Sequence, residues 1–445
     1  MITSPAFAGK RFAVLGLARS GKAAAEALIA SGAEVIAWDR QDVARAPFEG
    51  RCRLVDPLEL DLSGFAGVVI SPGVPLNSHP IGPYVWQYGL PVTGDIELFA
   101  FARPSLPPHK VVGITGTNGK STTTALVHHI LREAGVPCVM GGNIGDPIMA
   151  QEPLPEGGVY VLELSSFQID LTFTLDCDVA ALINITPDHL DRYSDFAAYA
   201  AAKERLFTQQ HEGCAIICDE DAATQAIAAR MDGVGRPPIR VKSTSLELPV
   251  SPSLAGPHNA QNAAIAQEIC RQLGLSMDQI AHGLSTYRGL PHRMERVCEA
   301  AGVSYINDSK ATNAASTAPA LAAFPPDPAI NQGAPRIHWI VGGLPKEPGL
   351  GACAAHLGNV AAAYTVGEAG PMFADLLADK VPTHRCELIN EAVRRARDAA
   401  KPGDIVLLSP ACASYDQFRD YEKRGNHFRQ MVGAMTGTDA GEQDA

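Results

Sequence analysis

The sequence predicts an α/β protein of three domains built on parallel sheets. The chain has 445 residues, which is too long for one ordinary hydrophobic core. Apolar, strand-like runs alternate with helical patterns, and glycine-rich turns follow the first strand of each of two such stretches. We expect domains over residues 1–99, 100–290 and 291–445.

Composition narrows the class of protein. Apolar residues make up 46% of the chain and charged residues 19%, which is typical of a globular protein. The net charge of -12 disfavours a nucleic-acid partner, because a phosphate backbone is bound by a basic surface. The ten cysteines match no zinc pattern and are expected to be buried thiols. With no signal peptide and no apolar run of membrane-spanning length, we expect a cytoplasmic monomer.

The first predicted domain is Rossmann-like. Residues 11–16 indicate a buried strand, residues 16–21 a glycine turn before an alanine-rich helix, and residues 34–38 a second strand that ends at Asp39. Ala18 replaces the middle glycine of the dinucleotide-binding pattern. The pattern is weak alone, so an NAD site, another nucleotide diphosphate and a purely structural turn all remain open.

Two further segments complete this domain. Residues 68–73 indicate a strand that runs into a turn, and residues 94–99 follow. The proline-rich residues 103–109 are typical of a linker, which puts the first boundary near residue 100.

The central domain opens on a predicted phosphate-binding loop at residues 113–124. A short apolar strand precedes it at residues 109–112, and apolar residues at helical spacing follow it. Glycines let backbone N–H groups face phosphate oxygens, and the helix N-terminus adds positive potential. Lys120 would reach the β- and γ-phosphates and Ser121 would ligate Mg²⁺. Ile114 occupies the place of the usual first glycine, but an ATP or GTP site is the working hypothesis.

Later strands of this domain carry candidate ligands at their ends. Glu163 ends the apolar run 159–163, where it suits a Mg²⁺ ligand beside a phosphate loop. His189 follows the predicted strand 178–186, and its place at a strand end favours a function.

Two further features of the central domain are ambiguous. Lys203 has the pattern of an ordinary surface lysine on a helix. Asn259 and Asn262 lie one turn apart at a helix start within residues 256–264, where they either read a base edge or cap the helix.

The third domain is predicted to be a second doubly wound parallel sheet, entered through a hinge at residues 290–295. Its expected strands are residues 303–307, 337–341, 360–366 and 404–409. Polar residues gather beyond these strand ends, which favours a ligand crevice. They are Asp308, Lys310, Thr312, Gly342, Gly343, Lys346 and residues 409–416. The small, acidic tail 436–445 is expected to be disordered.

Dispersed motifs from about residue 10 to 430 resemble the Mur ligases of bacterial peptidoglycan synthesis. Many motifs in one order are far more specific than any one of them. The phosphate loop of this family has the pattern Gly-Thr-Asn-Gly-Lys, which does not require the glycine that Ile114 replaces. The motifs are Gly16-Leu-Ala-Arg-Ser-Gly21, Ser71-Pro-Gly73, Gly94-Asp-Ile-Glu-Leu-Phe99, Gly116-Thr-Asn-Gly-Lys-Ser121, Gly141-Gly-Asn-Ile-Gly145, Leu162-Glu-Leu-Ser-Ser-Phe-Gln168, Asp188-His-Leu-Asp-Arg192, His258-Asn259, Pro291-His-Arg293, Asn307-Asp-Ser-Lys-Ala-Thr-Asn313 and Ser409-Pro-Ala-Cys-Ala-Ser414.

The resemblance implies an activity. The motifs are most similar to those of the branch that joins D-glutamate to UDP-N-acetylmuramoyl-L-alanine at the expense of ATP, through an acyl phosphate. Two Mg²⁺ sites would serve the reaction. By the same resemblance Lys203 would be a carbamylated lysine, which requires an environment that lowers its pKa.

The resemblance also implies a role for each candidate residue. The catalytic residues would be Lys120, His189, Lys203 and Lys310. The ATP site would comprise Gly116, Thr117, Asn118, Gly119, Lys120, Ser121, Thr122, Asn259, Asn262, Arg293 and Asp308. The UDP substrate would contact Ala18, Arg19, Ser20, Asp39, Arg40, Ser71, Gly73, Asn143 and Gln168. The amino acid would contact Thr312, Lys346, Ser414, Tyr415 and Tyr421, and the metal ligands would be Ser121, Glu163, His189 and carbamylated Lys203. Tyr421 departs from the expected phenylalanine, so its role is the least firm of these.

Three alternatives remain open. A related ligase for another amino acid, including L-glutamate or folylpolyglutamate synthesis, would keep the ATP residues and change the third-domain pocket. An NAD-dependent dehydrogenase would leave Lys120, Glu163 and Lys310 without a role. A non-catalytic nucleotide-gated protein would not need Lys346 and Ser414.

Overall fold

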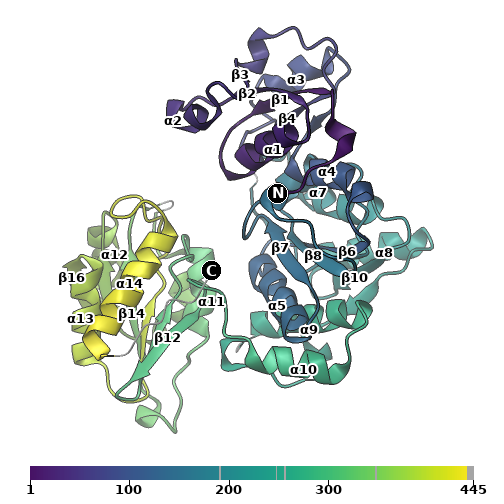
Figure 1. Ribbon diagram of the computed structural model, residues 1–445. Helices are drawn as coiled ribbons and strands as arrows, with labels where there is room; N and C mark the ends of the chain where they lie inside the picture. Colours follow the sequence, from purple (N-terminus) through teal and green to yellow (C-terminus); the bar gives the residue numbers. More distant parts are fainter. Residues whose placement is uncertain (190–191, 247, 255–256, 346–347, 438–445) are drawn as a thin grey trace. The chain divides into compact units, whose positions relative to one another are not determined.

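The computed structural model describes residues 1–189, 192–246, 248–254, 257–345 and 348–437. The chain forms two compact units. The first holds Met1–Val250 and Pro257–Thr286, and the second is formed by the chain from Tyr287 onward together with residues 251–254. The first unit contains two sheets and the second contains one, so the predicted α/β class is confirmed (Figure 1).

The first sheet has five parallel strands in the order β3-β2-β1-β4-β5. Its strands are β1 (Arg11–Leu15), β2 (Glu34–Trp38), β3 (Arg53–Leu54), β4 (Gly67–Ile70) and β5 (Val92–Thr93). Its helices are α1 (Arg19–Ala30), α2 (Asp42–Arg45), α3 (Ile81–Trp86) and α4 (Asp95–Ala102). The βαβ unit predicted at residues 11–39 is therefore present, and its turn begins at Gly16 with a φ of 86°.

The second sheet has six parallel strands in the order β11-β10-β9-β6-β8-β7. The strands are β6 (His109–Thr115), β7 (Cys138–Gly142), β8 (Gly158–Glu163), β9 (Val179–Leu182), β10 (Cys214–Cys218) and β11 (Ile239–Val241). The helices are α5 (Lys120–Glu133), α6 (Ser166–Asp170), α7 (Phe196–Thr208), α8 (Ala222–Gly233), α9 (Pro257–Gln272) and α10 (Met277–Thr286). The strand expected over 178–186 is shorter than predicted, because β9 ends at Leu182.

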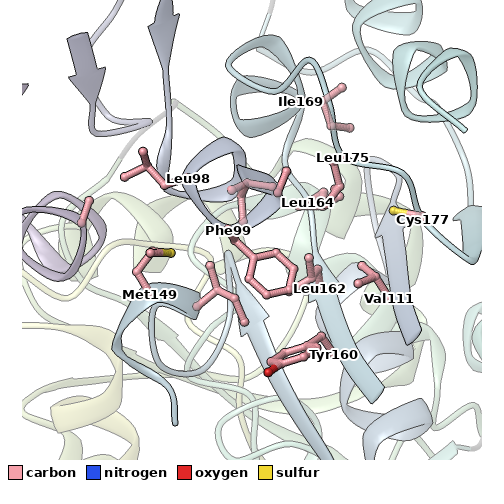
Figure 2. Packing of buried hydrophobic residues seen from close by; sticks show 14 of the residues in the cluster. Leu98, Phe99, Val111, Met149, Tyr160, Leu162, Leu164, Ile169, Leu175 and Cys177 are labelled. Carbon is pink, nitrogen blue, oxygen red and sulfur yellow. The ribbon is translucent and has the colours of Figure 1, made fainter. Parts of the chain in front are cut away.

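A continuous hydrophobic core joins these two sheets through α4. Figure 2 shows Phe99 of α4 beside Leu162 and Tyr160 of the second sheet, and the rings of Phe99 and Tyr160 lie 4.9 Å apart. The segment predicted as a linker at residues 103–109 is a short fixed connection. Arg103 donates a hydrogen bond to the carbonyl of Asp176 and a 3.2 Å bond to His109. Tertiary hydrogen bonds therefore hold the segment that the proline content indicated as a linker.

The third sheet has the order β12-β13-β17-β14-β15-β16. Its strands are β12 (Glu295–Ala300), β13 (Val303–Asn307), β14 (Ile337–Gly342), β15 (Val360–Val366), β16 (Thr383–Glu387) and β17 (Ile405–Leu408). Its helices are α11 (Ala314–Ala322), α12 (Gly370–Leu377), α13 (Ile389–Ala399) and α14 (Tyr421–Thr436).

The prediction of an all-parallel third sheet was wrong at one edge. β12 pairs antiparallel with β13, and neither β12 nor β16 was predicted. Both are edge strands with several polar and exposed residues, so they lack the apolar run that marks a buried central strand.

The predicted hinge at residues 290–295 is held by a buried polar network. Asn307 Nδ2 lies 2.9 Å from His292 Nδ1, and the His292 N–H donates to Glu295 at 2.8 Å. Arg429 of α14 donates to Glu295 Oε1 at 2.6 Å. The segment is thus tied to β13 and α14, and a hinge motion stays a prediction.

All ten cysteines are free thiols, and the expected burial holds for six of them, since Cys52, Cys138, Cys214 and Cys298 are half-buried. In the ranges that the structure describes, no helix combines the length and apolar character needed to cross a bilayer. The tail prediction falls mostly outside the described residues, since α14 includes Thr436 and Gly437 ends the description.

Candidate functional site

The predicted phosphate loop has the expected strand–loop–helix geometry. β6 ends at Thr115 and α5 begins at Lys120, and Gly119 caps that helix with a φ of 83°. A Cβ on Gly119 would lie 2.1 Å from Asn262 Oδ1, so glycine is required both by conformation and by space. The open N-terminus of α5 suits an anion.

Two lysines converge on one oxygen of this loop. Lys120 Nζ lies 2.9 Å from the Gly116 carbonyl oxygen and 2.8 Å from that of Thr117. Lys203 Nζ, from α7, lies 2.8 Å from the same Gly116 oxygen. The amino groups of two lysines therefore share one acceptor at the phosphate loop.

Lys203 is not the surface residue that its sequence pattern indicated. Its side chain is 1% exposed, and its Nζ lies 4.6 Å from the ring centroid of Tyr199. Burial and the charge of Lys120 hold the pKa of Lys203 well below its usual value. The helical pattern of Ala200–Leu206 gave no clue, because alanines on both sides hide which face is buried. Only the family resemblance pointed to Lys203.

The loop is also fixed by a residue that the sequence did not single out. The Asn184 carbonyl accepts from the Thr117 N–H at 2.8 Å, and its side-chain oxygen accepts from the Asn118 N–H at 2.9 Å. Asn184 follows β9, the neighbour of β6, so its position beyond an adjacent strand end was the available signal.

Asn262 contacts the phosphate loop directly rather than capping α9. Thr123 Oγ1 lies 3.3 Å from its side-chain oxygen, and its amide donates to Asn259 at 3.2 Å. The two asparagines are thus joined, and Asn262 belongs to the loop's surroundings.

Glu163 has the character of a cation ligand. It is buried at the end of β8, and Asn143 Nδ2 donates to its Oε1 at 2.8 Å. Its other oxygen, Oε2, is buried without a hydrogen-bond partner among the described residues. A buried carboxylate oxygen that lacks a donor fits a Mg²⁺ ligand. The described residues hold no cluster of three His, Cys, Asp or Glu side chains of the kind that binds a metal alone, so hydroxyl, phosphate or water oxygens would complete the shell.

His189 lies beyond β9 in a left-handed conformation with a φ of 53°. Its ring packs 4.9 Å from that of Phe167, and its Nε2 lies 3.5 Å from Asp188. Its side chain is half exposed and hence accessible to a ligand.

In the first sheet, Asp39 organises the turn predicted to bind nucleotide. Its two oxygens accept hydrogen bonds from the N–H of Leu17 at 2.7 Å and of Gln41 at 2.9 Å. Arg19 stands at the start of α1, whose first turn also contains Ser20, and donates to the Gly145 carbonyl at 2.6 Å. The carboxylate that a dehydrogenase would use for ribose is therefore largely engaged by the protein's own backbone.

The remaining predicted substrate contacts surround the end of β4. Ser71 is buried, and a Cβ on Gly16 would lie 3.0 Å from its Cβ. Gly73 has open space where its side chain would be. A cavity of about 60 Å³ lies close by, and its lining includes Pro72, Phe167 and Arg192. Gln168 is buried in the capping box of α6, where it accepts from the Ser165 N–H, so a contact between Gln168 and substrate stays a prediction.

In the second unit, Asp308 lies at the end of β13. Its Oδ2 accepts from the Ser409 hydroxyl at 2.7 Å and its Oδ1 from the Met294 N–H at 3.2 Å. Complete burial raises the pKa of Asp308 to about 7. Nearby, the Arg293 N–H donates to Leu290, and Lys310 Nζ lies 5.3 Å from the Tyr421 ring centroid.

Four of the five predicted amino-acid residues follow β13 or β17 in the chain. Ser414 is buried, whereas Tyr415 is exposed. Tyr421 begins α14, and its carbonyl accepts from the Ser309 hydroxyl at 2.8 Å. Thr312 follows in the loop after β13, and Lys346 lies outside the described residues.

Comparisons with known proteins define the class to which this fold and site belong. The Mur ligase middle domain matches residues 114–235, and the Mur ligase glutamate ligase domain matches residues 292–412. Two solved structures share the fold at low sequence identity. UDP-N-acetylmuramate–alanine ligase from Thermotoga maritima has a TM-score of 0.59 at 16% identity and covers 96% of this chain and 99% of its own. A pseudomurein peptide ligase from Methanothermus fervidus has a TM-score of 0.53 at 17% identity and covers 96% and 100%. The chain belongs to the Mur ligase family.

Curated relatives narrow the comparison to one kind of ligase. The UDP-N-acetylmuramoylalanine–D-glutamate ligase of Novosphingobium aromaticivorans is 59% identical over 442 residues, which are 98% of this chain and 97% of the relative. The enzymes of that name from Sphingopyxis alaskensis and Zymomonas mobilis are 58% and 51% identical, each over 98% of this chain and 100% of their own length.

Proposed function

We infer that this protein is an ATP-dependent ligase that joins D-glutamate to UDP-N-acetylmuramoyl-L-alanine during synthesis of the peptidoglycan precursor. The relatives that are 51–59% identical over nearly the whole chain carry the choice of substrates. The structural observation that supports the chemistry is Lys120 at the open N-terminus of α5, because it places positive charge at a phosphate loop.

The proposed reaction proceeds in two steps. A carboxylate oxygen of the UDP-sugar substrate attacks the γ-phosphorus of ATP, and the bond from phosphorus to ADP breaks. The D-glutamate amine then attacks the acyl carbon, and the amide C–N bond forms. The bond from that carbon to the phosphate oxygen breaks, its electron pair leaves with phosphate, and the amine loses a proton. Because charge is spread over the transferring phosphoryl oxygens, positioned cations supply most of the catalysis.

Lys120 is proposed to turn from the loop carbonyls to the β- and γ-phosphates. Its present hydrogen bonds to Gly116 and Thr117 are to neutral oxygens, and phosphate oxygens are stronger acceptors. Thr117, Asn118, Gly119 and the start of α5, which includes Ser121 and Thr122, then provide backbone N–H groups to the nucleotide.

Lys203 is proposed to carry a carbamate. A neutral amine attacks CO₂, the N–C bond forms and one proton is released, which leaves an anionic group. The burial and the neighbouring Lys120 charge that lower the pKa of Lys203 favour the neutral amine. The carbamate would place a negative charge beside the Lys120 ammonium group and provide an anionic oxygen ligand.

Two Mg²⁺ sites are proposed, one held by Ser121 and Glu163 and the other by His189 and the Lys203 carbamate. The unpaired Glu163 oxygen supports the first assignment. Bound Mg²⁺ would offset phosphate charge. Glu163 is held in place for this by the 2.8 Å hydrogen bond from Asn143.

The other roles follow the three proposed domains, residues 1–99, 100–290 and 291–445, in a monomer of the cytoplasm. The first would hold the UDP substrate through Ala18, Arg19, Ser20, Asp39, Arg40, Ser71 and Gly73, together with Asn143 and Gln168 of the central domain. The second would hold ATP with help from Asn259, Asn262, Arg293, Asp308 and Lys310. The third would hold D-glutamate through Thr312, Lys346, Ser414, Tyr415 and Tyr421.

Phosphate release from ATP tests the function. We expect release only when UDP-N-acetylmuramoyl-L-alanine and D-glutamate are both present. The matched variants are Lys120→Ala, which should abolish turnover, and Lys110→Ala, which removes a β6 lysine outside the loop and should not. Equal turnover with L-glutamate would refute the substrate assignment, and unchanged turnover in Lys120→Ala would refute the role of the loop.

The carbamate has its own test. With ¹³C-labelled CO₂ we expect a carbamate carbon signal that disappears in Lys203→Met. The same signal in wild type and variant would refute the assignment to Lys203.

A further inference from the structure

One buried arginine lies beneath the strand-end loops of the second unit. Arg424 projects from α14 and is 1% exposed, which makes it one of the largest fully buried side chains of the protein. Its Nε donates to Ser309 Oγ at 3.0 Å, and its Nη2 donates to the carbonyls of Ser309 at 2.8 Å and Cys412 at 3.0 Å. Its Nη1 donates to the Ala413 carbonyl at 3.1 Å.

These acceptors belong to two loops that carry predicted substrate residues. Ser309 precedes Lys310 in the loop after β13, and Cys412 and Ala413 precede Ser414 in the loop after β17. The third loop, after β14, is bonded to the second, since Leu344 and Ala413 exchange backbone hydrogen bonds of 2.9 and 3.0 Å. One planar guanidinium thus fixes three loops that are far apart in sequence.

Glycine at position 343 is required by the same arrangement. Gly343 has a φ of 135°, and a Cβ there would lie 2.4 Å from the Ala413 carbonyl oxygen and 3.1 Å from Arg424 Nη1. The third loop can therefore approach Arg424 only because this residue has no side chain.

No carboxylate forms a direct ion pair with Arg424 among the described residues, although the charge of Asp416 acts on it from a longer distance. Its hydrogen-bond acceptors are a hydroxyl and three carbonyls, and it makes no ion pair with any acidic side chain in the described part of the chain. Burial lowers the pKa of Arg424 to about 10, so the guanidinium stays protonated at neutral pH. A buried unneutralised cation attracts an anion in the adjacent site.

The hydrogen bonds of Arg424 also polarise the peptide unit that precedes Ser414. The Ala413 carbonyl accepts from both Arg424 and Leu344, which polarises the peptide unit whose N–H belongs to Ser414. Ser414 is buried, and its hydroxyl and N–H make no hydrogen bond to any residue that the structure describes. Both donors are therefore available to a carboxylate.

We propose that Arg424 is a positioning residue for the acceptor amino acid: it fixes the loops after β13, β14 and β17 and polarises the Ser414 peptide toward a carboxylate of that amino acid. This role rests on the proposed function, because the acceptor is D-glutamate only if the ligase assignment holds.

Steady-state kinetics of the full chain test the role. In Arg424→Ala we expect the KM for D-glutamate to rise about tenfold or more, which corresponds to the loss of hydrogen bonds from a charged group. The KM values for ATP and for the UDP-sugar should change less than about twofold. Arg424→Lys keeps the charge but cannot reach all four acceptors, so it should be intermediate. Millimolar guanidinium chloride should lower the raised KM of Arg424→Ala, and methylammonium chloride at equal ionic strength should not.

Two further variants separate positioning from folding. Arg429→Ala is the matched control, because it removes another α14 arginine, half-buried and bound to Glu295 rather than to the loops. It should lower the melting temperature and leave the KM for D-glutamate unchanged. Ser309→Ala removes the acceptor of Arg424 Nε together with the hydrogen bond to the Tyr421 carbonyl, and it should raise that KM about threefold, a test that remains if Arg424→Ala does not fold.

The outcomes are distinguishable. If Arg424→Ala or Ser309→Ala is folded and active with an unchanged KM for D-glutamate, or if all three KM values rise together, the role of Arg424 is refuted and the ligase assignment stands. If the wild-type protein releases no phosphate with D-glutamate, the proposed function itself fails.

Discussion

Asp95 is expected to make the first unit less stable as the pH rises through the mildly acidic range. It begins α4 and is 1% exposed, and neither carboxylate oxygen has a hydrogen-bond partner among the described residues. Burial raises the pKa of Asp95 from 3.8 to about 6, although the N–H groups of Asp95 and Ile96 at the helix start partly offset this. Asp95→Asn, which resembles the protonated acid in shape and charge, is the perturbation.

The sign and size follow from linkage. The folded state binds the proton more tightly than the unfolded chain, so that the stabilisation is fully present below pH 3.8 and is lost as the pH rises through about 6. A shift of about two pKa units corresponds to about 3 kcal/mol. The free energy of unfolding of Asp95→Asn minus that of wild type should therefore be about 3 kcal/mol larger at pH 7 than at pH 4. This corresponds to roughly 5 °C in melting temperature.

Differential scanning calorimetry at several pH values measures this, because it separates the transitions of the two units. Glu97→Gln is the control. Glu97 is equally buried on α4 but accepts hydrogen bonds from the Phe173 N–H at 2.7 Å and from the Thr174 N–H and hydroxyl at 3.0 and 2.8 Å. The Glu97→Gln variant retains Asp95, so its stability should differ between pH 4 and pH 7 by as much as that of the wild type. An identical pH dependence in wild type and Asp95→Asn would show that the reasoning is wrong.

Two more outcomes follow from the sites. Glu163→Gln should raise the Mg²⁺ concentration needed for half-maximal phosphate release by about tenfold or more, since an amide is a poorer ligand than a carboxylate. A Mg²⁺ titration with an unchanged half-saturating concentration would contradict this. Gly343→Ala should lower the melting temperature of the second unit and raise the KM for D-glutamate, because its Cβ would lie 2.4 Å from the Ala413 oxygen. Gly349→Ala, at a φ of 92° with open space around the Cβ, is the control for backbone strain alone and should leave that KM unchanged.

Much of the local structure was predictable from the sequence. The phosphate loop, its strand and its helix occur at the predicted residues, because glycines with positive φ and an apolar strand restrict the backbone strongly. The polar edge strands β12 and β16 escaped prediction, since exposed strands lack an apolar run.

The burial of Lys203 is a feature of the site that sequence patterns could not predict. Its helix is rich in alanine, so periodicity does not reveal the buried face, and the lysine resembles many exposed ones. Its burial depends on where α7 packs, which is decided by residues distant in the chain. The same holds for Arg424, whose four bonds reach Ser309, Cys412 and Ala413.

The sequence by itself determined the α/β class and the family, and it predicted the position of the glycine-rich loop. These depend on short-range features, namely glycines at fixed offsets, apolar runs and the order of motifs along the chain. Only the tertiary structure decided which polar groups lose water and share a neighbour. The low pKa of Lys203, the unpaired oxygen of Glu163 and the buried charge of Arg424 arise from desolvation by packed elements, and desolvation is a property of the folded chain.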